Sequence, residues 1–325
     1  MSEPRVSVSI TAFNHAPFIR QALDSVLAQQ TPFEVEILVG DDDSSDGTRE
    51  IIRNYAERYP DRIRAFYHAA ADKLRIKGRL TGRRNLANNL NSARGDFIAL
   101  LDGDDYWTDP TKLARQVEQL EGDSTLMTSF HDVDFVNEKG EIVNHPAPPG
   151  KPTERCTLND LISGDRVAQT GSVLFRRGAI HPLPAWYFET PVGDFPLHVM
   201  NGHRGDFGYI GRRMGCYRVH QGGIWSGGRT ESGWKDRSGE QLMGALRRNE
   251  VLMDLMATVI RNSAPRFRLA ARRRLSFFAY DSAILAGKLS DKPALRRNLS
   301  RMFRNLPWPG YVRLPVLWRL LRKAV

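Results

Sequence analysis

The sequence predicts an α/β fold with a mostly parallel sheet, because strand and helix signals alternate through its first half. Short apolar runs predict buried strands at 6–10, 35–39, 63–67 and 97–101. Segments with apolar residues at helical spacing separate and follow these runs. Repeated strand–helix units favour parallel strands joined by right-handed crossovers.

Helix starts can be located between the strands. The Ser-Ser pair at 44–45 is a candidate cap for a helix that follows the second strand. A basic loop over 73–84 precedes the next helix. After the fourth strand, Asp109 and Pro110 provide an N-cap and a first-turn proline for a helix that ends near residue 121.

The second half of the chain is less regular. We expect a hairpin within 133–143, a loop over 146–152, strands over 172–175 and 207–210, and a helix over 195–202. The glycine-rich run 222–228 predicts a loop. From about residue 238 onward the pattern becomes helical and basic, punctuated by prolines.

Composition limits the class of protein. A chain of 325 residues can form one large domain or two. Cys156 and Cys216 provide neither a disulfide framework nor zinc-ligand spacing, which favours a reducing compartment. The N-terminus lacks the apolar core of a signal peptide, and no apolar run approaches the ~18 residues of a spanning helix. We therefore expect a soluble or membrane-surface protein.

Positive charge is concentrated in the C-terminal quarter. Residues 240–325 hold 18 Lys or Arg and five Asp or Glu, a net charge of +13, whereas the whole chain carries +10. The remaining residues therefore sum to −3. Such an asymmetry suggests an anionic partner.

Three carboxylates follow the fourth strand, at Asp102, Asp104 and Asp105. They lie at the carboxyl end of a buried strand, where open α/β sheets bind ligands. Like charges this close repel each other unless a cation or hydrogen-bond donors compensate. A divalent ion bridging to phosphate would do so, because Mg²⁺ and Mn²⁺ prefer oxygen ligands. The alternative is a solvated acidic turn.

Two further polar segments share this edge. Asp41, Asp42 and Asp43 follow the second strand, and the segment 11–14 follows the first. Parallel strands bring their carboxyl ends to the same edge, so we expect the two acidic clusters to be neighbours. Carboxylates can accept hydrogen bonds from a base or a ribose, and an aromatic side chain can cover the base. This arrangement describes a nucleotide site.

These residues resemble the family 2 glycosyltransferases of GT-A fold, in several motifs and in the same order. The similarity spans roughly residues 4–228 and is carried by Val6–Asn14, Asp41–Thr48, Arg84-Asn85, Ala93–Asp96, Asp102-Gly103-Asp104 with Trp107, Val192–Leu197 and Tyr217–Ser226. It implies a GT-A-type, Rossmann-like sheet over 1–235, with a nucleotide-sugar half at 1–122 and an acceptor and catalytic half at 123–235. Residues 236–325 then form a basic helical extension.

The resemblance also implies roles for individual residues. The nucleotide-sugar contacts would be Thr11, Phe13, Asn14, Asp42, Arg84 and Asp102. Asp104 resembles the metal ligand of the family's Asp-x-Asp motif, with Asp102 and His220 as further metal candidates. Asp194 resembles the catalytic base.

Two positions depart from the family's commonest pattern. Asp43 replaces a glycine, and Asp105 adds a carboxylate beside the Asp-x-Asp motif. The role of each acid in the 41–43 triplet, and the identity of the side chain that touches the ion, therefore stay open.

The activity implied is inverting transfer of a sugar from a nucleotide-diphosphate donor, with Mn²⁺ or Mg²⁺ as cofactor. A UDP-sugar is the favoured donor, and the acceptor would be a lipid-linked or growing cell-surface glycan. Residues 240–325 would bind an anionic membrane, placing the protein in the cytoplasm on the inner face of the plasma membrane. The segment 314–323 supports this, because its apolar side, Trp318 and cationic residues are typical of an interfacial helix.

Other classes of protein fit less well. Glycoside hydrolases also use paired carboxylates, but they need neither nucleotide nor metal. Sugar-phosphate nucleotidyltransferases resemble a different pattern, with a glycine-rich basic loop after the first strand. A basic adaptor on anionic membrane would leave the acidic clusters unexplained. No Gly-x-Gly-x-x-Gly of an oxidoreductase follows a predicted strand, and the basic region lacks the aromatic platforms of a nucleic-acid binder.

Overall fold

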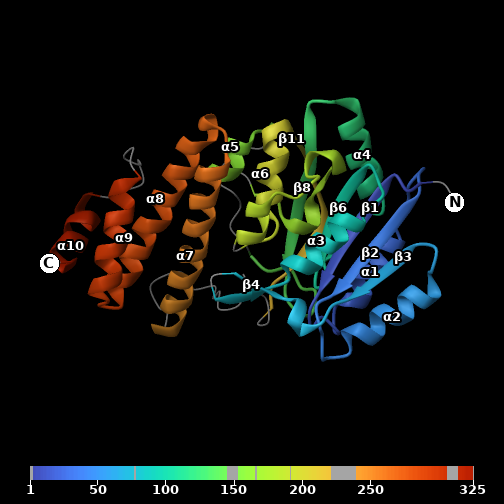
Figure 1. The fold of residues 1–325 in the computed structure, drawn as a ribbon, viewed down its shortest axis with the longest axis horizontal. Helices are drawn as coiled ribbons and strands as arrows, with labels where there is room; N and C mark the ends of the chain where they lie inside the picture. Colours follow the sequence, from blue (N-terminus) through green and yellow to red (C-terminus); the bar gives the residue numbers. More distant parts are fainter. Residues whose placement is uncertain are drawn as a thin grey trace.

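A mixed sheet with helices on its faces forms the centre of the protein, and further helices extend it on one side (Figure 1). This computed structural model describes residues 3–76, 78–144, 153–164, 167–190, 192–220, 239–305 and 314–324. The main sheet has the strand order β3-β2-β1-β6-β10-β8-β11-β7, and β9 pairs with β11. The predicted α/β class is therefore confirmed.

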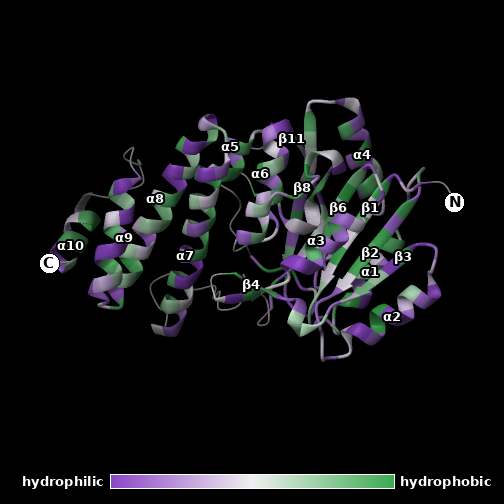
Figure 2. Cartoon of the chain, in the orientation of Figure 1, coloured by the Kyte–Doolittle hydropathy of each residue, from purple (hydrophilic) through white to green (hydrophobic). Residues whose placement is uncertain are grey.

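The first half of the sheet is parallel, as the alternation of strands and helices predicted. Its strands are β3 (Ile63–Tyr67), β2 (Val35–Asp41), β1 (Val6–Ala12) and β6 (Phe97–Asp102). In this register Thr11 lies opposite both Gly40 and Asp102. The continuous apolar runs are buried on both faces, and Figure 2 shows these central strands as largely hydrophobic.

Antiparallel pairs enter the second half of the sheet. Its strands are β10 (Leu174–Arg176), β8 (Leu126–Val136), β11 (Asp206–Arg218), β7 (Tyr106–Trp107) and β9 (Arg155–Cys156). β10 is antiparallel to both neighbours, whereas β11 runs parallel to β8. β11 is longer than the predicted 207–210, because the strand continues past the exposed arginines 212 and 213 through two register shifts.

The helices of the first half lie between the predicted strands. They are α1 (Ile19–Leu27), α2 (Thr48–Arg58), α3 (Arg83–Ser92) and α4 (Lys112–Gly122). α1 buries its apolar face as the helical spacing indicated. However, α2 has Gly47 as its N-cap, so the predicted caps Ser44 and Ser45 are wrong. Asp109 accepts a hydrogen bond through Oδ1 from the Thr111 amide at 2.8 Å, but Thr111 is the N-cap of α4, so the predicted N-cap Asp109 and first-turn Pro110 lie just before the helix.

Two segments differ from their predicted structure. The predicted basic loop is more regular than expected, and the predicted hairpin is less regular. The basic loop before α3 holds η1 (Ala70–Asp72) and a separate hairpin, β4 (Leu74–Ile76) and β5 (Arg79–Thr81). The predicted hairpin at 133–143 is reduced to a single antiparallel bridge between Val136 and Ile142. The predicted loops over 146–152 and 222–228, the second with Trp225, lie outside the described residues.

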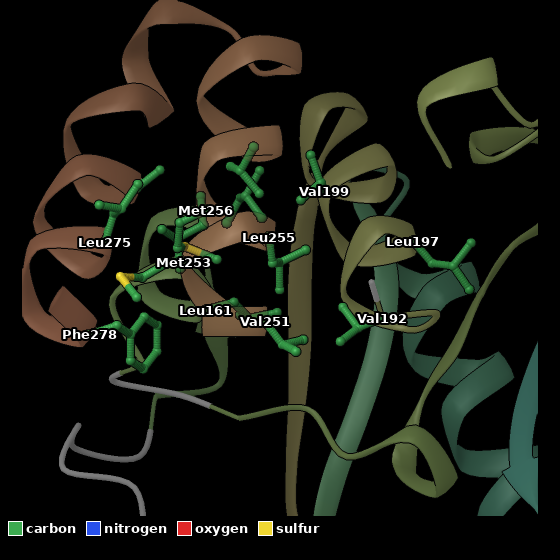
Figure 3. Close-up of a cluster of buried hydrophobic side chains, with 14 of the residues drawn as sticks. Leu161, Val192, Leu197, Val199, Val251, Met253, Leu255, Met256, Leu275 and Phe278 are labelled. Atoms are coloured by element: carbon green, nitrogen blue, oxygen red, sulfur yellow. The ribbon is translucent and has the colours of Figure 1, made fainter. Parts of the chain in front are cut away.

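The C-terminal helices lie in a row beside the sheet (Figure 1). They are α7 (Gly239–Asn262), α8 (Pro265–Lys288), α9 (Lys292–Arg304) and α10 (Leu314–Ala324). Side chains of α7 and α8 share one buried cluster with those of α5 (Leu158–Ser163) and α6 (Phe195–Arg204), as Figure 3 shows. The C-terminal helices are therefore packed onto α5 and α6 by apolar contact.

The apolar side of α10 does not face outward, as an interfacial helix would require. Leu317 and Leu320 are buried in the same cluster as α8 and α9, leaving Trp318 as an exposed apolar side chain at 64%. The helix uses its apolar stripe to pack on the protein, because the neighbouring helices offer the nearest apolar surface. None of the described helices is long and apolar enough to cross a membrane.

Candidate functional site

The loops after β1, β2 and β6 meet at one edge of the sheet. Thr11 donates a hydrogen bond from Oγ1 to Oδ1 of Asp102 at 3.0 Å. Its carbonyl accepts from the Gly103 amide at 2.8 Å, and the Asp42 amide donates to the Ala12 carbonyl at 2.9 Å. The structure thus brings the two acidic clusters together across the end of β1, as parallel strands require.

Asn14 holds two of these loops together. It has a left-handed backbone, with φ at +54°, which an Asn tolerates well. Its Oδ1 accepts from the Ser45 amide at 3.0 Å, and its own amide donates to Ser44 Oγ at 2.9 Å. The side chain is therefore occupied in shaping the edge, and would act on a nucleotide through the loops that it holds.

The three acids of the 41–43 triplet have different environments. Asp41 is fully buried and pairs with Arg49 at 2.7 Å. Asp43 has φ at +63°, in the left-handed region that favours glycine, the family's usual residue at this position, and that Asp tolerates. Asp42 is buried and pairs with Lys73 at 3.7 Å, and burial raises the pKa of Asp42 despite that positive charge.

Asp102 and Asp105 also differ in their surroundings. Asp105 is buried and accepts through Oδ1 from the backbone amide of Arg218 at 2.8 Å. The Arg218 side chain in turn donates from Nε to the Asp104 carbonyl at 2.9 Å, so the two residues brace this loop. Burial and the charges of Asp104 and Asp102 raise the pKa of Asp105. Burial and the charge of Asp104 also raise the pKa of Asp102, to about 7.

Two imidazoles face Asp104. His220 Nε2 donates to Oδ2 of Asp104 at 2.9 Å, and His15 Nε2 lies 3.8 Å from the same oxygen. Burial alone would raise the pKa of Asp104, but the hydrogen bond from His220 and the charges of His15 and His220 together lower it. His15 was not predicted from the sequence, because its approach to Asp104 depends on how its loop docks.

The acids and imidazoles at this edge do not form a complete metal cage. Across the described ranges, no three His, Cys, Asp or Glu side chains are arranged to hold a metal ion. Asp104 and His220 nevertheless offer one ionised oxygen and one nitrogen side by side. That donor pair fits Mn²⁺ or Mg²⁺, ions that commonly keep waters and take further oxygens from substrate phosphates.

Asp194 begins α6 and carries two distinct carboxylate oxygens. Oδ1 accepts from the Phe195 amide at 2.8 Å, so the side chain does act at the helix start. Oδ2 accepts from Thr170 Oγ1 at 3.4 Å. Thr170, in η2 (Thr170–Ser172), lies against β6, which brings Asp194 to the same edge as Asp102. One oxygen is thus held by the helix while the other faces the site.

Two neighbouring arginines at the start of α3 have opposite exposures. Arg84, the predicted phosphate contact, is exposed. Arg83 is buried and donates from Nη2 to the carbonyls of Thr190 and Val192, in the segment before Asp194. Its Nε and Nη1 have no hydrogen-bond partner. The burial of Arg83 could have been predicted from helical spacing, because Arg83 lies on the apolar face of α3 with residues 87 and 90.

Comparison with solved structures identifies the fold. The Pyrobaculum calidifontis mannosyltransferase PcManGT, solved with GDP-Man and Mn²⁺, matches with a TM-score of 0.58 and 18% identity, over 100% of this chain and 80% of its own. S. aureus TarS 1–349, solved with UDP-GlcNAc, matches at 0.53 and 14%, over 93% of this chain and 89% of its own. The fold is that of the GT-A glycosyltransferases.

Sequence comparison then gives the family. The model of Glycosyl transferase family 2 matches residues 7–180, so the chain belongs to this family. The uncharacterized protein Rv1520 of Mycobacterium tuberculosis is 33% identical over 254 residues, which cover 77% of this chain and 68% of the relative. The uncharacterized glycosyltransferase alr2836 of Nostoc is 31% identical over 147 residues, covering 45% and 42%.

Proposed function

We propose that the protein is an inverting glycosyltransferase that moves a sugar from a nucleotide-diphosphate donor to an acceptor hydroxyl. The observation that carries this proposal is the approach of three carboxylates at one sheet edge. Asp102 ends β6, Asp104 follows it in the next turn, and Asp194 is joined to that strand through Thr170. Binding and proton transfer thereby have separate acids within one site.

The nucleotide would lie along the loops after β1 and β2. Thr11, Phe13 and Asp42 are suited to the nucleoside, with Asp102 on its ribose. Asp104 and His220 would hold Mn²⁺ or Mg²⁺. When bound, the ion supplies positive charge against the leaving diphosphate. Arg84, exposed at the start of α3, is free to approach the phosphates from the solvent side.

Asp194 would act as general base in a single displacement. Its Oδ2 accepts the proton of the acceptor hydroxyl while that oxygen forms a bond to the anomeric carbon. The bond from the same carbon to the phosphate oxygen breaks, releasing a nucleoside diphosphate. Attack from the face opposite the leaving group inverts the anomeric configuration. A positioned base of this kind contributes about 10²–10⁴-fold to the rate.

A UDP-sugar remains the favoured donor, with GDP- and dTDP-sugars as alternatives. The two structural neighbours were solved with UDP-GlcNAc and GDP-Man, and the second also with Mn²⁺. These complexes support a nucleotide-sugar partner and a divalent ion without choosing the base.

The acceptor and the location are proposals of the same kind. We propose a lipid-linked or cell-surface glycan as acceptor, and a peripheral position on the cytoplasmic face of the plasma membrane. The support is the charge of +13 over 240–325, with Trp318 as an exposed aromatic side chain on α10, whose apolar stripe packs on the protein. In this account residues 1–235 perform catalysis and 236–325 meet the membrane surface.

Product stereochemistry and an Asp194 variant test the proposal together. Incubation with a panel of nucleotide sugars and Mn²⁺, followed by proton NMR, should show a product of inverted anomeric configuration. Asp194→Asn should lower kcat by about 10²-fold or more, while nucleotide affinity is retained. Asp61→Asn, an exposed carboxylate, is the matched control and should behave like the wild type. Retained configuration, or normal turnover by Asp194→Asn, would refute the assigned mechanism.

A further inference from the structure

A cavity of about 220 Å³ lies where three of the C-terminal helices meet. It is formed by the C-terminal end of α8, the start of α9 and the C-terminal end of α10, and Figure 1 shows α10 at the end of the molecule opposite β2 and β3. Since about 10–15 Å³ is enough for one water molecule, this cavity can hold a much larger group. Its polar lining residues are Ser290, Lys292, Arg322 and Lys323.

The close approach of α10 to α8 places the basic end of α10 at this cavity. Gly287 permits the approach, because a Cβ at this position would lie only 3.0 Å from Cδ2 of Leu320. Lys323 then donates a hydrogen bond from Nζ to the Gly287 carbonyl at 3.1 Å. An ammonium group carries three donors, so two of those on Lys323 are left for a ligand.

Three cations line the cavity, with no carboxylate among the described lining residues. Within the part of the chain that the structure describes, the side chains of Lys292 and Arg322 have no hydrogen-bond or ion-pair partner. Asp291, beside Lys292, accepts through Oδ1 from the Ala294 amide at 3.0 Å and caps α9. Like charges held together repel each other unless an anion compensates, so the cavity favours a negatively charged ligand.

We propose that this cavity binds the phosphate of an anionic membrane lipid and prefers a phosphomonoester headgroup to a phosphodiester. The inference deepens the proposed function, because it rests on the peripheral membrane position and names the residues that recognise the surface. A phosphomonoester carries a charge of about −1.5 to −2 at pH 7 and three acceptor oxygens. These oxygens match the donors of Lys292, Arg322 and Lys323, whereas a diester has a single charge and two free oxygens.

The surface around the cavity favours a lipid over a soluble phosphate. Helices α9 and α10 carry five and three Lys or Arg, eight in all, and no Asp or Glu. Each cation near an anionic leaflet contributes about 1 kcal/mol of attraction. The exposed Trp318 lies one helical turn before Arg322 on the same side of α10, and tryptophan is enriched at membrane–water interfaces. A helix whose apolar stripe packs on the protein can thus still meet a membrane through a headgroup site.

Vesicle flotation of the full-length chain, with lipid titration, tests this inference. Phosphatidylcholine vesicles contain either phosphatidic acid, a phosphomonoester, or phosphatidylglycerol, a phosphodiester, at matched zeta potential. We expect wild type to bind the phosphatidic acid vesicles about 10-fold more tightly than the phosphatidylglycerol vesicles. The double variant Lys292→Gln, Arg322→Gln should bring this ratio close to 1. Thermal unfolding should show that the variant remains folded, because neither side chain has a described partner to lose.

A second double variant controls for the loss of charge. Arg272→Gln, Arg304→Gln removes two exposed cations of α8 and α9 that do not line the cavity. It should weaken binding to both kinds of vesicle by the same factor and keep their ratio. Equal affinity of wild type for the two vesicles, or an unchanged ratio in the variant of Lys292 and Arg322, would overturn the headgroup site.

Two further measurements separate the source of the phosphate and the dependence on the proposed function. Glycerol 3-phosphate carries a phosphomonoester without an apolar chain; calorimetric binding of it, together with no preference between vesicles, would overturn the lipid assignment. Nucleoside diphosphate binding in the presence of Mn²⁺ should be equal in wild type and both variants. Failure of wild type to bind either vesicle would overturn the proposed membrane position, whereas failure to bind any nucleotide would overturn the proposed sugar transfer.

Discussion

Arg83 donates a hydrogen bond from Nη2 to the carbonyl oxygen of Thr190 at 2.9 Å, joining the start of α3 to the segment before Asp194. The same nitrogen also donates to the Val192 carbonyl, two residues before Asp194. Gly193 lies against this guanidinium, with 3.3 Å from an added Cβ to Nη1. The position of the proposed base therefore depends on a buried arginine in another part of the chain.

Replacing this arginine should separate catalysis from binding. We expect Arg83→Met to lower kcat about 10- to 100-fold, because the segment before Asp194 loses two charge-assisted hydrogen bonds. The dissociation constant of the nucleoside diphosphate should change less than about 3-fold. Arg53→Met, an exposed arginine of α2, is the control. A rise in KM or Kd with normal kcat would show that Arg83 binds donor rather than positioning the base.

The close contact between Gly40 and Asn85 predicts a stability defect. Asn85 donates from Nδ2 to the Gly40 carbonyl at 2.8 Å, and a Cβ on Gly40 would lie 1.7 Å from Oδ1 of Asn85. Gly40→Ala should therefore push α3 away from β2 and lower the free energy of unfolding by about 1–3 kcal/mol. Urea denaturation measures this.

Gly122→Ala provides the matched control for that substitution. A Cβ at Gly122 would meet no atom within 4 Å, so this variant should be as stable as the wild type or slightly more so. Equal stability of the two alanine variants would contradict the packing described around Gly40.

Glu36 predicts a pH-dependent contribution to stability. This buried carboxylate accepts from Ser7 Oγ at 2.6 Å and from the Arg94 amide at 2.7 Å, and pairs with Arg64 at 3.1 Å. Burial alone would raise the pKa of Glu36, but these donors outweigh it and lower the pKa. Its stabilising effect is thus present above the ordinary Glu pKa and is lost as pH falls through the lowered value.

Glu36→Gln should accordingly cost about 2 kcal/mol of unfolding free energy at pH 7, and less as the pH approaches 3. Denaturant titrations of both proteins between pH 7 and pH 3 would measure the difference. Glu57→Gln on the exposed side of α2 should show no such deficit. A deficit that is constant with pH would mean that the charge of Glu36 contributes nothing.

Continuous apolar runs made the parallel half of the fold predictable. β1, β2 and β6 each end in the polar residues of the site, so the meeting of Asp42 and Asp102 at one edge followed from strand order alone. β4 and β5 could not be predicted in this way. Each strand has only three residues, which is too short for a clear alternating pattern. The hairpin is held near the site by the contact of Lys73 with Phe13, which depends on the tertiary structure.

Side-chain roles that depend on tertiary docking were harder to predict. A motif pointed to Arg84, whereas burial distinguishes its neighbour Arg83. The proximity of His15 to Asp104 arises when the loop after β1 docks beside the loop after β6. The apolar stripe of α10 was equally compatible with lipid or protein, and only the presence of α8 and α9 beside it decides between them.

The most direct test of a nucleotide-sugar site is the thermal stability of the purified protein with UDP, GDP, dTDP, CMP and NAD, each with and without Mn²⁺. A ligand at ~100 times its dissociation constant adds ~2.7 kcal/mol to the free energy of unfolding. We expect stabilisation by one nucleoside diphosphate that requires Mn²⁺ and is abolished in Asp104→Asn. Unchanged stability with every nucleotide would contradict the proposed donor site.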